Sequence, residues 1–275
     1  MPILLEMKNE RELAFRYDLF ITPDWRDRFD SLVNESVDIP AEGRVLDVNC
    51  GTGAHSIELG GRLLGKGEVV GIDPSAERIE LASAKVLAAK LDNVTFQREL
   101  ARRLPFPDSA FDVAIGDASM HATNEIEDLL SELLRLVKPQ GRVVLKLVTR
   151  GSFDEFFSLL WEALLTASMI DEVWPRLEQM MTERYTVSDA ELMAVQAGLR
   201  KVASVTSKED FSFETGNDFL TSPLIEDFFL DTWMAIVPES RRLEVRQSLV
   251  SIIERERQRA PYEVSIKATV LSGIK

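Results

Sequence analysis

The chain has 275 residues, 45% of them hydrophobic, and a formal net charge of −14. This composition supports a full core, and the length suits one large domain or a domain with an insertion. Binding to DNA or RNA requires Lys and Arg to neutralise phosphates, so the acidic balance argues against a nucleic-acid partner. Because Cys50 is the single cysteine, an intramolecular disulfide is excluded and a reducing, cytoplasmic setting is expected.

The N-terminal part, residues 1–40, is predicted to form two helices, one over Asn9–Phe20 and one over Asp24–Ser36. Pro40 then breaks the pattern. The helices either cover an edge of a sheet or close over a ligand as a lid, with Tyr17 nearest to that ligand. No apolar run here has the length of a signal peptide, and no stretch of the chain approaches the roughly 20 apolar residues of a membrane span.

The central part, residues 41–150, alternates strand and helix, which predicts right-handed βαβ units and a parallel sheet. Strands are expected near 44–48, 68–72, 94–97, 111–116 and 142–148, and helices near 54–64, 76–91 and 125–136. Pro139 and Gly141 predict a turn before the fifth strand. Tyr262–Lys275 is expected to be the closing strand. Ligands of such sheets bind beyond the carboxyl ends of the strands.

A glycine loop follows the first strand and indicates a nucleotide-like ligand. The run from Val45 to Ser56 reads VLDVNCGTGAHS, and a second strand ends in Asp73, 20 residues after Gly53. This is the spacing at which an acid meets ribose hydroxyls. A phosphate-binding P-loop is excluded because Ala54 and His55 follow Gly53. A dinucleotide fold is disfavoured because Asp47 would repel a pyrophosphate, whereas it suits a ligand with a positive group.

The third part, residues 151–261, is predicted to be a mainly helical insertion. Phe153–Ala167 is apolar at a helical period, Ser188 and Glu191 form a capping-box pattern, and Val202–Phe213 alternates like a strand. Two further helices are expected, one from Ser222–Pro223 and one over Glu239–Gln258. The first of these carries Phe228, Phe229 and Trp233, which either cover an acceptor pocket or form the surface of a homodimer.

Four ordered stretches carry a resemblance to a known family. They are LDVNCGTG (46–53), VVGIDPS (69–75), LPFPDSAFDVAI (104–115) and LLRLVKPQGRVVL (133–145). Together they resemble the class I S-adenosylmethionine-dependent methyltransferases, in the broad group that includes the ubiquinone and menaquinone methyltransferases. The resemblance implies an α/β, Rossmann-like fold: a seven-stranded, mostly parallel sheet with helices on both faces and a helical insertion before the last strands. It divides the chain into a helical lid (1–40), a cofactor-binding core (41–150 and 262–275) and an insertion (151–261) that contains the sixth strand.

The resemblance also implies roles for particular residues toward S-adenosylmethionine. Asp47 would accept a hydrogen bond from the amino group, Gly51 and Gly53 would let the backbone pass the methionine chain, and Asp73 would bind both ribose hydroxyls. Arg78 would flank the adenine. The remaining expected cofactor contacts are Tyr17, Pro74, Ala101 and Asp117.

Two positions depart from the family pattern. Asn49 replaces the usual glycine; asparagine tolerates left-handed backbone, and its side chain is expected near the cofactor carboxylate. Leu100 replaces the Asp that usually receives the adenine amino group, so a hydrogen bond worth roughly 0.5–1.5 kcal/mol is expected to be lost.

The expected chemistry is methyl transfer to a small, partly apolar acceptor, giving S-adenosylhomocysteine. Asp117 and His121 are the candidates for contacting the acceptor and moving its proton. No Cys, His and carboxylate cluster has metal-ligand spacing, so no metal is expected. Two alternatives remain open: a cofactor-binding protein without transferase activity, and an NAD(P)-dependent oxidoreductase.

Overall fold

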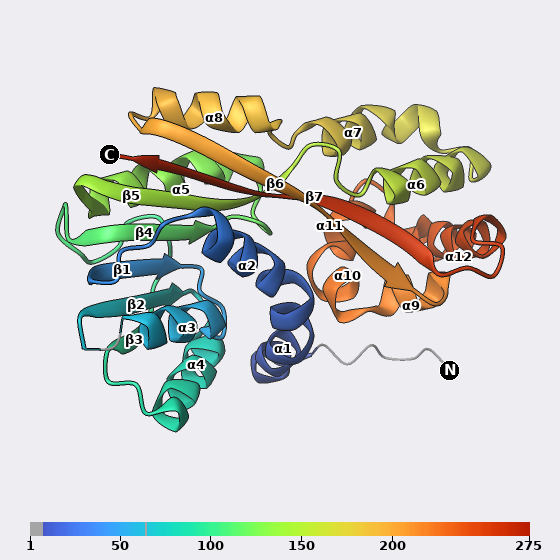
Figure 1. Cartoon of the computed structure of the whole chain (residues 1–275). Coiled ribbons are helices and arrows are strands. Elements are labelled where there is room, and N and C mark those ends of the chain that lie inside the picture. The colour runs from blue at the N-terminus through green and yellow to red at the C-terminus, as the bar shows by residue number, and fades with distance from the viewer. Residues whose placement is uncertain (1–7, 64) are drawn as a thin grey trace.

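The structure is a computed structural model that describes residues 8–63 and 65–275. Within these residues one sheet has the strand order β3-β2-β1-β4-β5-β7-β6 (Figure 1). Its strands are β1 (Gly43–Val48), β2 (Gly67–Asp73), β3 (Val94–Arg98), β4 (Phe111–Asp117), β5 (Val137–Thr149), β6 (Arg200–Phe213) and β7 (Tyr262–Ile274). The seven-stranded α/β fold predicted from the motifs is confirmed.

Five neighbouring strands of the sheet are parallel, and β7 runs antiparallel to both β5 and β6. The register aligns the carboxyl ends of three strands, because Val48 of β1 pairs with Ile72 of β2 and with Gly116 of β4. The loops that follow these strands therefore meet at one edge of the sheet, where ligands of parallel sheets bind.

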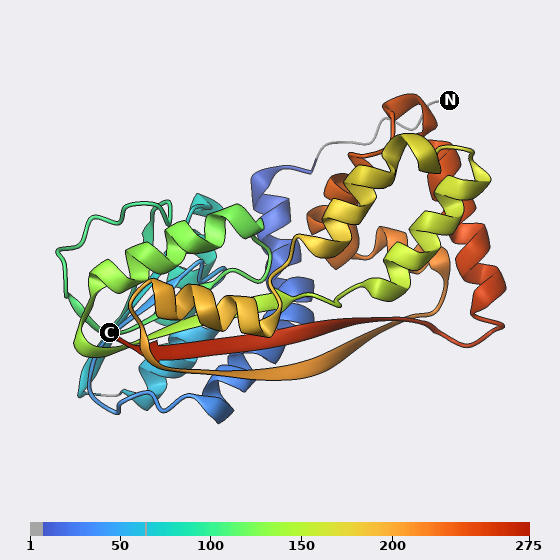
Figure 2. The ribbon, with the colours of Figure 1, turned by 90° about the horizontal axis from the view of Figure 1, so that it is seen from above.

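Helices cover both faces of the sheet (Figures 1 and 2). One apolar cluster joins the sheet to α2 (Asp27–Ser36), α3 (Ala54–Arg62) and α4 (Ala76–Ala89). The other joins the opposite face to α5 (Thr123–Leu136) and α8 (Val187–Gln196). Alternation along β1 explains this division, since Val45 belongs to the first cluster while Leu46 and Val48 belong to the second.

A helical region lies beyond the carboxyl ends of the parallel strands, and β6 and β7 extend into it (Figures 1 and 2). It comes from two insertions. The first, between β5 and β6, contains α6 (Asp154–Thr166) and α7 (Ile170–Thr182) and leads into α8. The second, between β6 and β7, contains α9 (Gly216–Thr221), α10 (Pro223–Phe228), α11 (Leu230–Met234) and α12 (Glu239–Glu256). None of the helices in the described part of the chain has the length and hydropathy needed to cross a membrane.

Aromatic side chains fill the core of the helical region. Trp233 stacks on Phe156 with ring centroids 4.3 Å apart and on Phe229 at 5.2 Å. Trp25, from the N-terminal part, joins the same core and lies 5.3 Å from Phe229. Phe229 and Trp233 are therefore buried within the chain itself, and they do not form the outer surface that a homodimer contact through them would need.

The N-terminal part differs from the two separate helices predicted. A continuous helical run links α1 (Glu10–Arg16), the π-helix η1 (Tyr17–Arg26) and α2. Pro23 cannot donate a backbone hydrogen bond, yet the chain continues, because the i→i+5 pattern bridges it: the amide of Asp27 donates to the carbonyl of Thr22. The first seven residues of the predicted lid lie outside the described residues.

Three other predictions from the sequence are wrong in detail. The capping box of α8 is formed by Thr186 and Asp189, while Glu191 instead accepts a hydrogen bond from Ser204. Pro139 and Gly141 lie inside β5, where the pairing with β4 shifts register, so this segment is a bulge and not a turn. The helix predicted to follow Pro223 breaks at Phe229 into α10 and α11.

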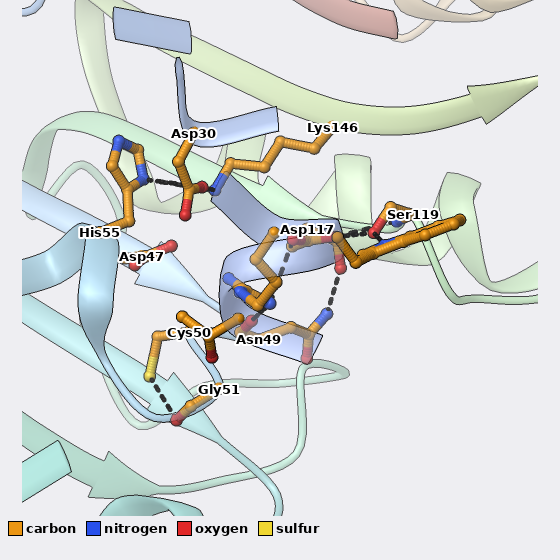
Figure 3. A network of polar contacts seen from close by, with 12 residues as sticks. Asp30, Asp47, Asn49, Cys50, Gly51, His55, Asp117, Ser119 and Lys146 are labelled. Atoms are coloured by element: carbon orange, nitrogen blue, oxygen red, sulfur yellow. Dashed lines mark hydrogen bonds and ion pairs between the residues drawn. The ribbon is translucent and has the colours of Figure 1, made fainter. Parts of the chain in front are cut away.

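A buried group of charges joins α2 to the sheet (Figure 3). Lys146 of β5 is fully buried and forms an ion pair with Asp30 of α2, and its Nζ lies 3.2 Å from Nδ1 of His55 on α3. Burial alone would raise the pKa of Asp30, but the charges of Lys146, His55 and Arg26 outweigh it and hold that pKa at about 2. Burial would also lower the pKa of Lys146, but Asp30 outweighs it, so both groups stay charged.

Replacing Lys146 with Met should lower the free energy of unfolding by about 3–5 kcal/mol, because it leaves the Asp30 carboxylate buried without its partner. Urea unfolding followed by circular dichroism measures this loss. Asp30→Asn/Lys146→Met should recover part of it, since the remaining groups are neutral. Lys138→Met is the matched control: its pair with Asp112 is partly exposed and should contribute about 1 kcal/mol or less. A double variant no more stable than Lys146→Met would contradict this account.

Stability should also fall as the pH drops below about 6.5, the pKa of an unperturbed histidine. Burial, followed by the charge of Lys146, lowers the pKa of His55 in the folded protein. The unfolded chain therefore binds this proton first, and acid favours unfolding. His55→Gln should reduce the slope of unfolding free energy against pH between about 5 and 6.5. His121→Gln changes an exposed histidine and should keep the wild-type slope; equal slopes in all three proteins would refute the prediction.

Candidate functional site

The loop between β1 and α3 requires left-handed backbone at three positions. Asn49, Gly51 and Gly53 have φ values of 60°, 60° and 78°. Glycine is needed at Gly51 for a second reason: a Cβ there would lie 2.6 Å from a ring carbon of Tyr17. Asn49 adopts the left-handed conformation expected of it, and its side-chain amide donates to the carbonyl of Asp117 at 2.9 Å. The amide therefore ties the β1 loop to the β4 loop.

Asp47 is fully buried near the end of β1 and keeps one free acceptor. Its Oδ2 accepts a hydrogen bond from Ser56 Oγ at 2.6 Å. Its Oδ1 has no hydrogen-bond partner among the described residues. A buried carboxylate oxygen without a donor is costly. It fits a ligand that brings its own donor or positive group.

Asp73, at the end of β2, accepts hydrogen bonds from the loop after β1 and from the residues that follow β2. Its Oδ2 accepts from the amide of Gly51 at 2.9 Å, and its Oδ1 accepts from the amide of Ser75 at 3.0 Å. Arg78 lies 3.7 Å from Oδ1. Burial raises the pKa of Asp73, against the opposing effects of Arg78 and the two amides. Each carboxylate oxygen retains a lone pair for a further donor.

Tyr17 and Arg26 of η1 cover the β1 loop, and both are buried. The Nη1 of Arg26 donates to the carbonyl of Asn49 at 2.8 Å and to the hydroxyl of Tyr17 at 3.0 Å. The guanidinium also forms an ion pair with Asp117 at 3.1 Å. The guanidinium of Arg78 lies over the Tyr17 ring, 4.0 Å from its centroid. Arg26 therefore lies beside Asp117 at the end of β4, and Arg78 lies beside Asp73 at the end of β2.

The loop after β4 is attached to the same cover (Figure 3). Asp117 Oδ1 accepts from the amide of Ser119 at 2.9 Å and from its hydroxyl at 2.6 Å. The indole of Trp25 donates to that hydroxyl at 2.9 Å. Asp117 is thus held by Ser119 on one oxygen and paired with Arg26 on the other.

Two cavities have His121 in their walls. The smaller, about 120 Å³, is lined by four of the predicted cofactor residues, Asn49, Pro74, Leu100 and Ala101, together with His121. The larger, about 290 Å³, lies between the β4 loop and the helical region. Its walls include His121, Phe157, Phe228, Phe229 and Trp233. His121 Nε2 is 3.3 Å from the side-chain nitrogen of Asn49. Asp117 lines neither cavity.

The predicted site residues therefore fall into two groups. Asn49, Pro74, Leu100, Ala101 and His121 share the smaller cavity. The other group lies beneath or within the cover formed by η1: Tyr17, Asp47, Gly51, Asp73, Arg78 and Asp117. Gly53 is the N-cap of α3, and a Cβ there would lie 2.4 Å from Phe96. Arg78 stacks on Tyr17, whereas the family resemblance implies that it flanks an adenine.

Sequence reasoning missed the buried charges Arg26, Asp30 and Lys146. The signal for Lys146 is a single cation inside the apolar run VVLKLVT, which is unusual for a strand buried on both faces. Arg26 and Asp30 flank the apolar face of α2, and their partners are far away in the sequence. Among residues 8–63 and 65–275, no group of three or more His, Cys, Asp or Glu side chains is arranged to hold a metal ion.

Comparison with known sequences identifies the part of the chain that carries the motifs. The family model described as a methyltransferase domain matches residues 45–141. The uncharacterized methyltransferase YcgJ of Bacillus subtilis is 31% identical over 114 residues, which are 42% of this chain and 44% of that protein. The demethylmenaquinone methyltransferase of Lactiplantibacillus plantarum is 35% identical over 109 residues, 39% of this chain and 46% of that protein. The chain thus spans less than half the length of these relatives.

Solved structures resemble the whole fold. The crystal structure of YcgJ matches with a TM-score of 0.57 at 21% identity, covering 90% of this chain and 98% of that one. A Haemonchus contortus phosphoethanolamine N-methyltransferase, solved with phosphomonomethylethanolamine and S-adenosylhomocysteine, matches with a TM-score of 0.57 at 16% identity, covering 98% of this chain and 61% of that one. Residues 45–141 therefore match a methyltransferase domain, and the chain as a whole has the fold of solved methyltransferase structures, as the motifs predict.

Proposed function

We propose that this protein is an S-adenosylmethionine-dependent methyltransferase that acts on a small, partly apolar molecule. The observation that carries the proposal is the junction at His121. On one side lies the cavity lined by the predicted cofactor residues, and on the other lies the aromatic cavity of the helical region. A donor and an acceptor held in these two cavities would approach each other at His121, and such proximity supplies much of the catalysis of a displacement reaction.

The donor set of the site fits S-adenosylmethionine. Asp47 Oδ1 is a buried acceptor without a partner, suited to the cofactor's amino group. Asp73 offers remaining lone pairs to ribose hydroxyls, and Asn49, Pro74, Leu100 and Ala101 line a cavity beside His121 for part of the adenosine. When bound, the cofactor supplies an electrophilic methyl group on a sulfonium. A relative in the fold was solved with S-adenosylhomocysteine, which agrees with this choice.

The residues of this chain would bind and orient the two ligands and exclude water. The aromatic walls of the larger cavity provide a surface of low polarity, where positive charge is poorly solvated. His121 borders both cavities and is the better placed of the two candidates to accept a proton from the acceptor. We assign Asp117 a holding role instead, because Arg26 and Ser119 engage both of its oxygens.

The methyl acceptor of the related demethylmenaquinone methyltransferases is not assigned to this protein. The matched region ends at residue 141, whereas the walls of the aromatic cavity come largely from residues 148–233.

We propose the domain division predicted from the sequence, with a lid at 1–40, a core at 41–150 and 262–275, and an insertion at 151–261. We also retain a cytoplasmic setting from the single cysteine and the absence of a nucleic-acid partner from the net charge of −14. A homodimer would have to use a surface other than Phe229 and Trp233.

A second candidate function is cofactor binding without transfer. Its support is the cover over the β1 loop, in which Tyr17 contacts Gly51 and the Arg26 guanidinium lies beside Asp117. Four ion-pair contacts hold this cover to the helical region, between Lys8 and Arg16 on one side and Glu226 and Asp227 on the other. If the cover closes again over a bound cofactor, it would retain the cofactor without releasing it for transfer.

Isothermal titration calorimetry with S-adenosylmethionine should give an affinity in the micromolar range, about −7 to −8 kcal/mol. Asp73→Asn should weaken binding at least about tenfold, because it removes the charge from an acid expected to bind two hydroxyls. Glu99→Gln, on the neighbouring loop, is the control and should bind like wild type. Binding of NAD in place of S-adenosylmethionine would overturn the proposed function.

Tyr17→Ala should speed the binding of S-adenosylmethionine several-fold in stopped-flow fluorescence. Tyr17 lies against Gly51, so entry of a ligand along this loop requires the ring to move, and removing the ring lowers the population of the closed state. Phe15→Ala, on the exposed side of α1, is the control and should leave the rate unchanged. Slower or weaker binding by Tyr17→Ala would show that Tyr17 is a ligand contact and not a cover.

A further inference from the structure

The segment between α7 and α8 is held firmly against the larger cavity. Arg150, just after β5, donates from its backbone amide to the carbonyl of Tyr185 at 2.9 Å. Its side chain donates to the carbonyls of Arg184 at 3.1 Å and Thr182 at 2.5 Å. Three bonds from one residue therefore fix the backbone that carries Glu183, Arg184 and Tyr185, all of which line the cavity.

Arg184 is a half-buried cation without an ion-pair partner. Among the described residues, no carboxylate oxygen lies within 4.0 Å of its side-chain nitrogens. Its guanidinium carbon lies 5.6 Å from the centroid of Phe153, a fully buried ring of the aromatic core. Burial lowers the pKa of Arg184, against the opposing charges of Glu183 and Asp154, although an arginine remains protonated in proteins. Such a group is costly to bury unless an anion compensates for it.

The rest of the cavity wall combines aromatic rings with hydroxyl groups such as those of Ser119 and Thr232. Four aromatic residues line it: Phe157 of α6, Phe228 of α10, Trp233 of α11, and Phe229 between α10 and α11. Arg184 is the only Lys or Arg among its lining residues in the described chain. At about 290 Å³ the cavity is just below the range of roughly 300–1,000 Å³ found for ligand pockets, which suits a small ligand. These features together suit a flat, apolar ring that carries one negative charge.

We propose that the larger cavity binds a small aromatic carboxylic acid, with its ring among the aromatic side chains and its carboxylate paired with Arg184. Arg184 is then a specificity-determining residue for the acceptor. The role of this acid as methyl acceptor rests on the proposed function, whereas its binding does not. The planar guanidinium pairs with a carboxylate through two parallel hydrogen bonds, which gives orientation as well as affinity.

A carboxylate fits better than a phosphate monoester. A phosphate monoester carries a charge of about −1.5 to −2 at pH 7. One arginine would leave much of that charge uncompensated, and the exposed carboxylate of Glu183 also lines the cavity. Because the chain carries a net charge of −14, binding of a more highly charged anion would be opposed further.

Calorimetric titration of the full chain with 3,4-dihydroxybenzoate and with 3,4-dihydroxybenzamide tests this proposal. The two compounds have nearly the same shape and differ in charge. Wild type should bind the acid at least about tenfold more tightly than the amide, as expected for a charge-assisted pair. Arg184→Met should reduce that ratio to about twofold or less while the affinity for the amide stays nearly constant. Phenyl phosphate, as the phosphate probe, should bind more weakly than the acid.

The matched control is Arg176→Met, which removes an exposed arginine of α7 that does not line the cavity and should keep the wild-type ratio. Arg184→Lys should give an intermediate ratio, since it keeps the charge but loses the paired geometry. An unchanged acid-to-amide ratio in Arg184→Met, or binding of neither compound by wild type, would overturn the proposal. Tighter binding of phenyl phosphate than of the acid would overturn the choice of a carboxylate.

A parallel titration with S-adenosylmethionine separates this proposal from the proposed function. If S-adenosylmethionine fails to bind while the acid binds in an Arg184-dependent manner, the proposed function fails and the acid site stands. If S-adenosylmethionine binds and the acid does not, the acid site fails and the methyltransferase assignment is unaffected. Release of S-adenosylhomocysteine in the presence of 3,4-dihydroxybenzoate, lowered at least about tenfold in kcat/KM by Arg184→Met, would support both.

Discussion

The burial of opposite charges between the N-terminal helices and the sheet determines how the site is built. Asp30 meets Lys146, and Arg26 meets Asp117, with all four side chains almost fully removed from solvent. Removing one partner of such a pair leaves an uncompensated charge, so each pair fixes the position of the other element. The two pairs therefore fix the position of α2 and η1 relative to β4 and β5. In this position Tyr17 lies over the glycine loop and Trp25 contacts Ser119.

These charges also connect the two parts of the proposed reaction site. Arg26 contacts the carbonyl of Asn49 on the cofactor side, while Trp25, next to it in the chain, packs into the aromatic core that surrounds the larger cavity. A movement of η1 that exposes the β1 loop would therefore disturb the packing around the acceptor cavity as well. Binding at the two cavities is expected to be coupled through this segment, with each ligand affecting the affinity for the other.

The parts of the structure that the sequence predicts well are those set by neighbouring residues. The acids Asp47 and Asp73 near the strand ends, the left-handed Asn49 and the start of a helix at Pro223 all follow from local chemistry, and the family motifs add the seven-stranded sheet. The cover formed by η1 could not be predicted in this way. Arg26 finds its partners at Asn49 and Asp117, and Lys146 finds its partner at Asp30, 116 residues away. A helical period also cannot distinguish a break at Pro23 from a π-helical stretch, because the choice depends on what Tyr17 and Trp25 pack against.

The aromatic core of the helical region has a consequence for how the chain is made. Trp25 packs on Phe153, Phe211 and Phe229, and the last of these follows it by about two hundred residues. During synthesis from the N-terminus, Trp25 lacks these three aromatic partners until Phe153 has been made, and it lacks Phe229 until most of the chain has left the ribosome. Contacts over such separations form slowly, and exposed aromatic surface favours association in the meantime. Trp25 is thus synthesised well before part of its native environment, and a chaperone that covers η1 would shield this aromatic surface until Phe229 is available.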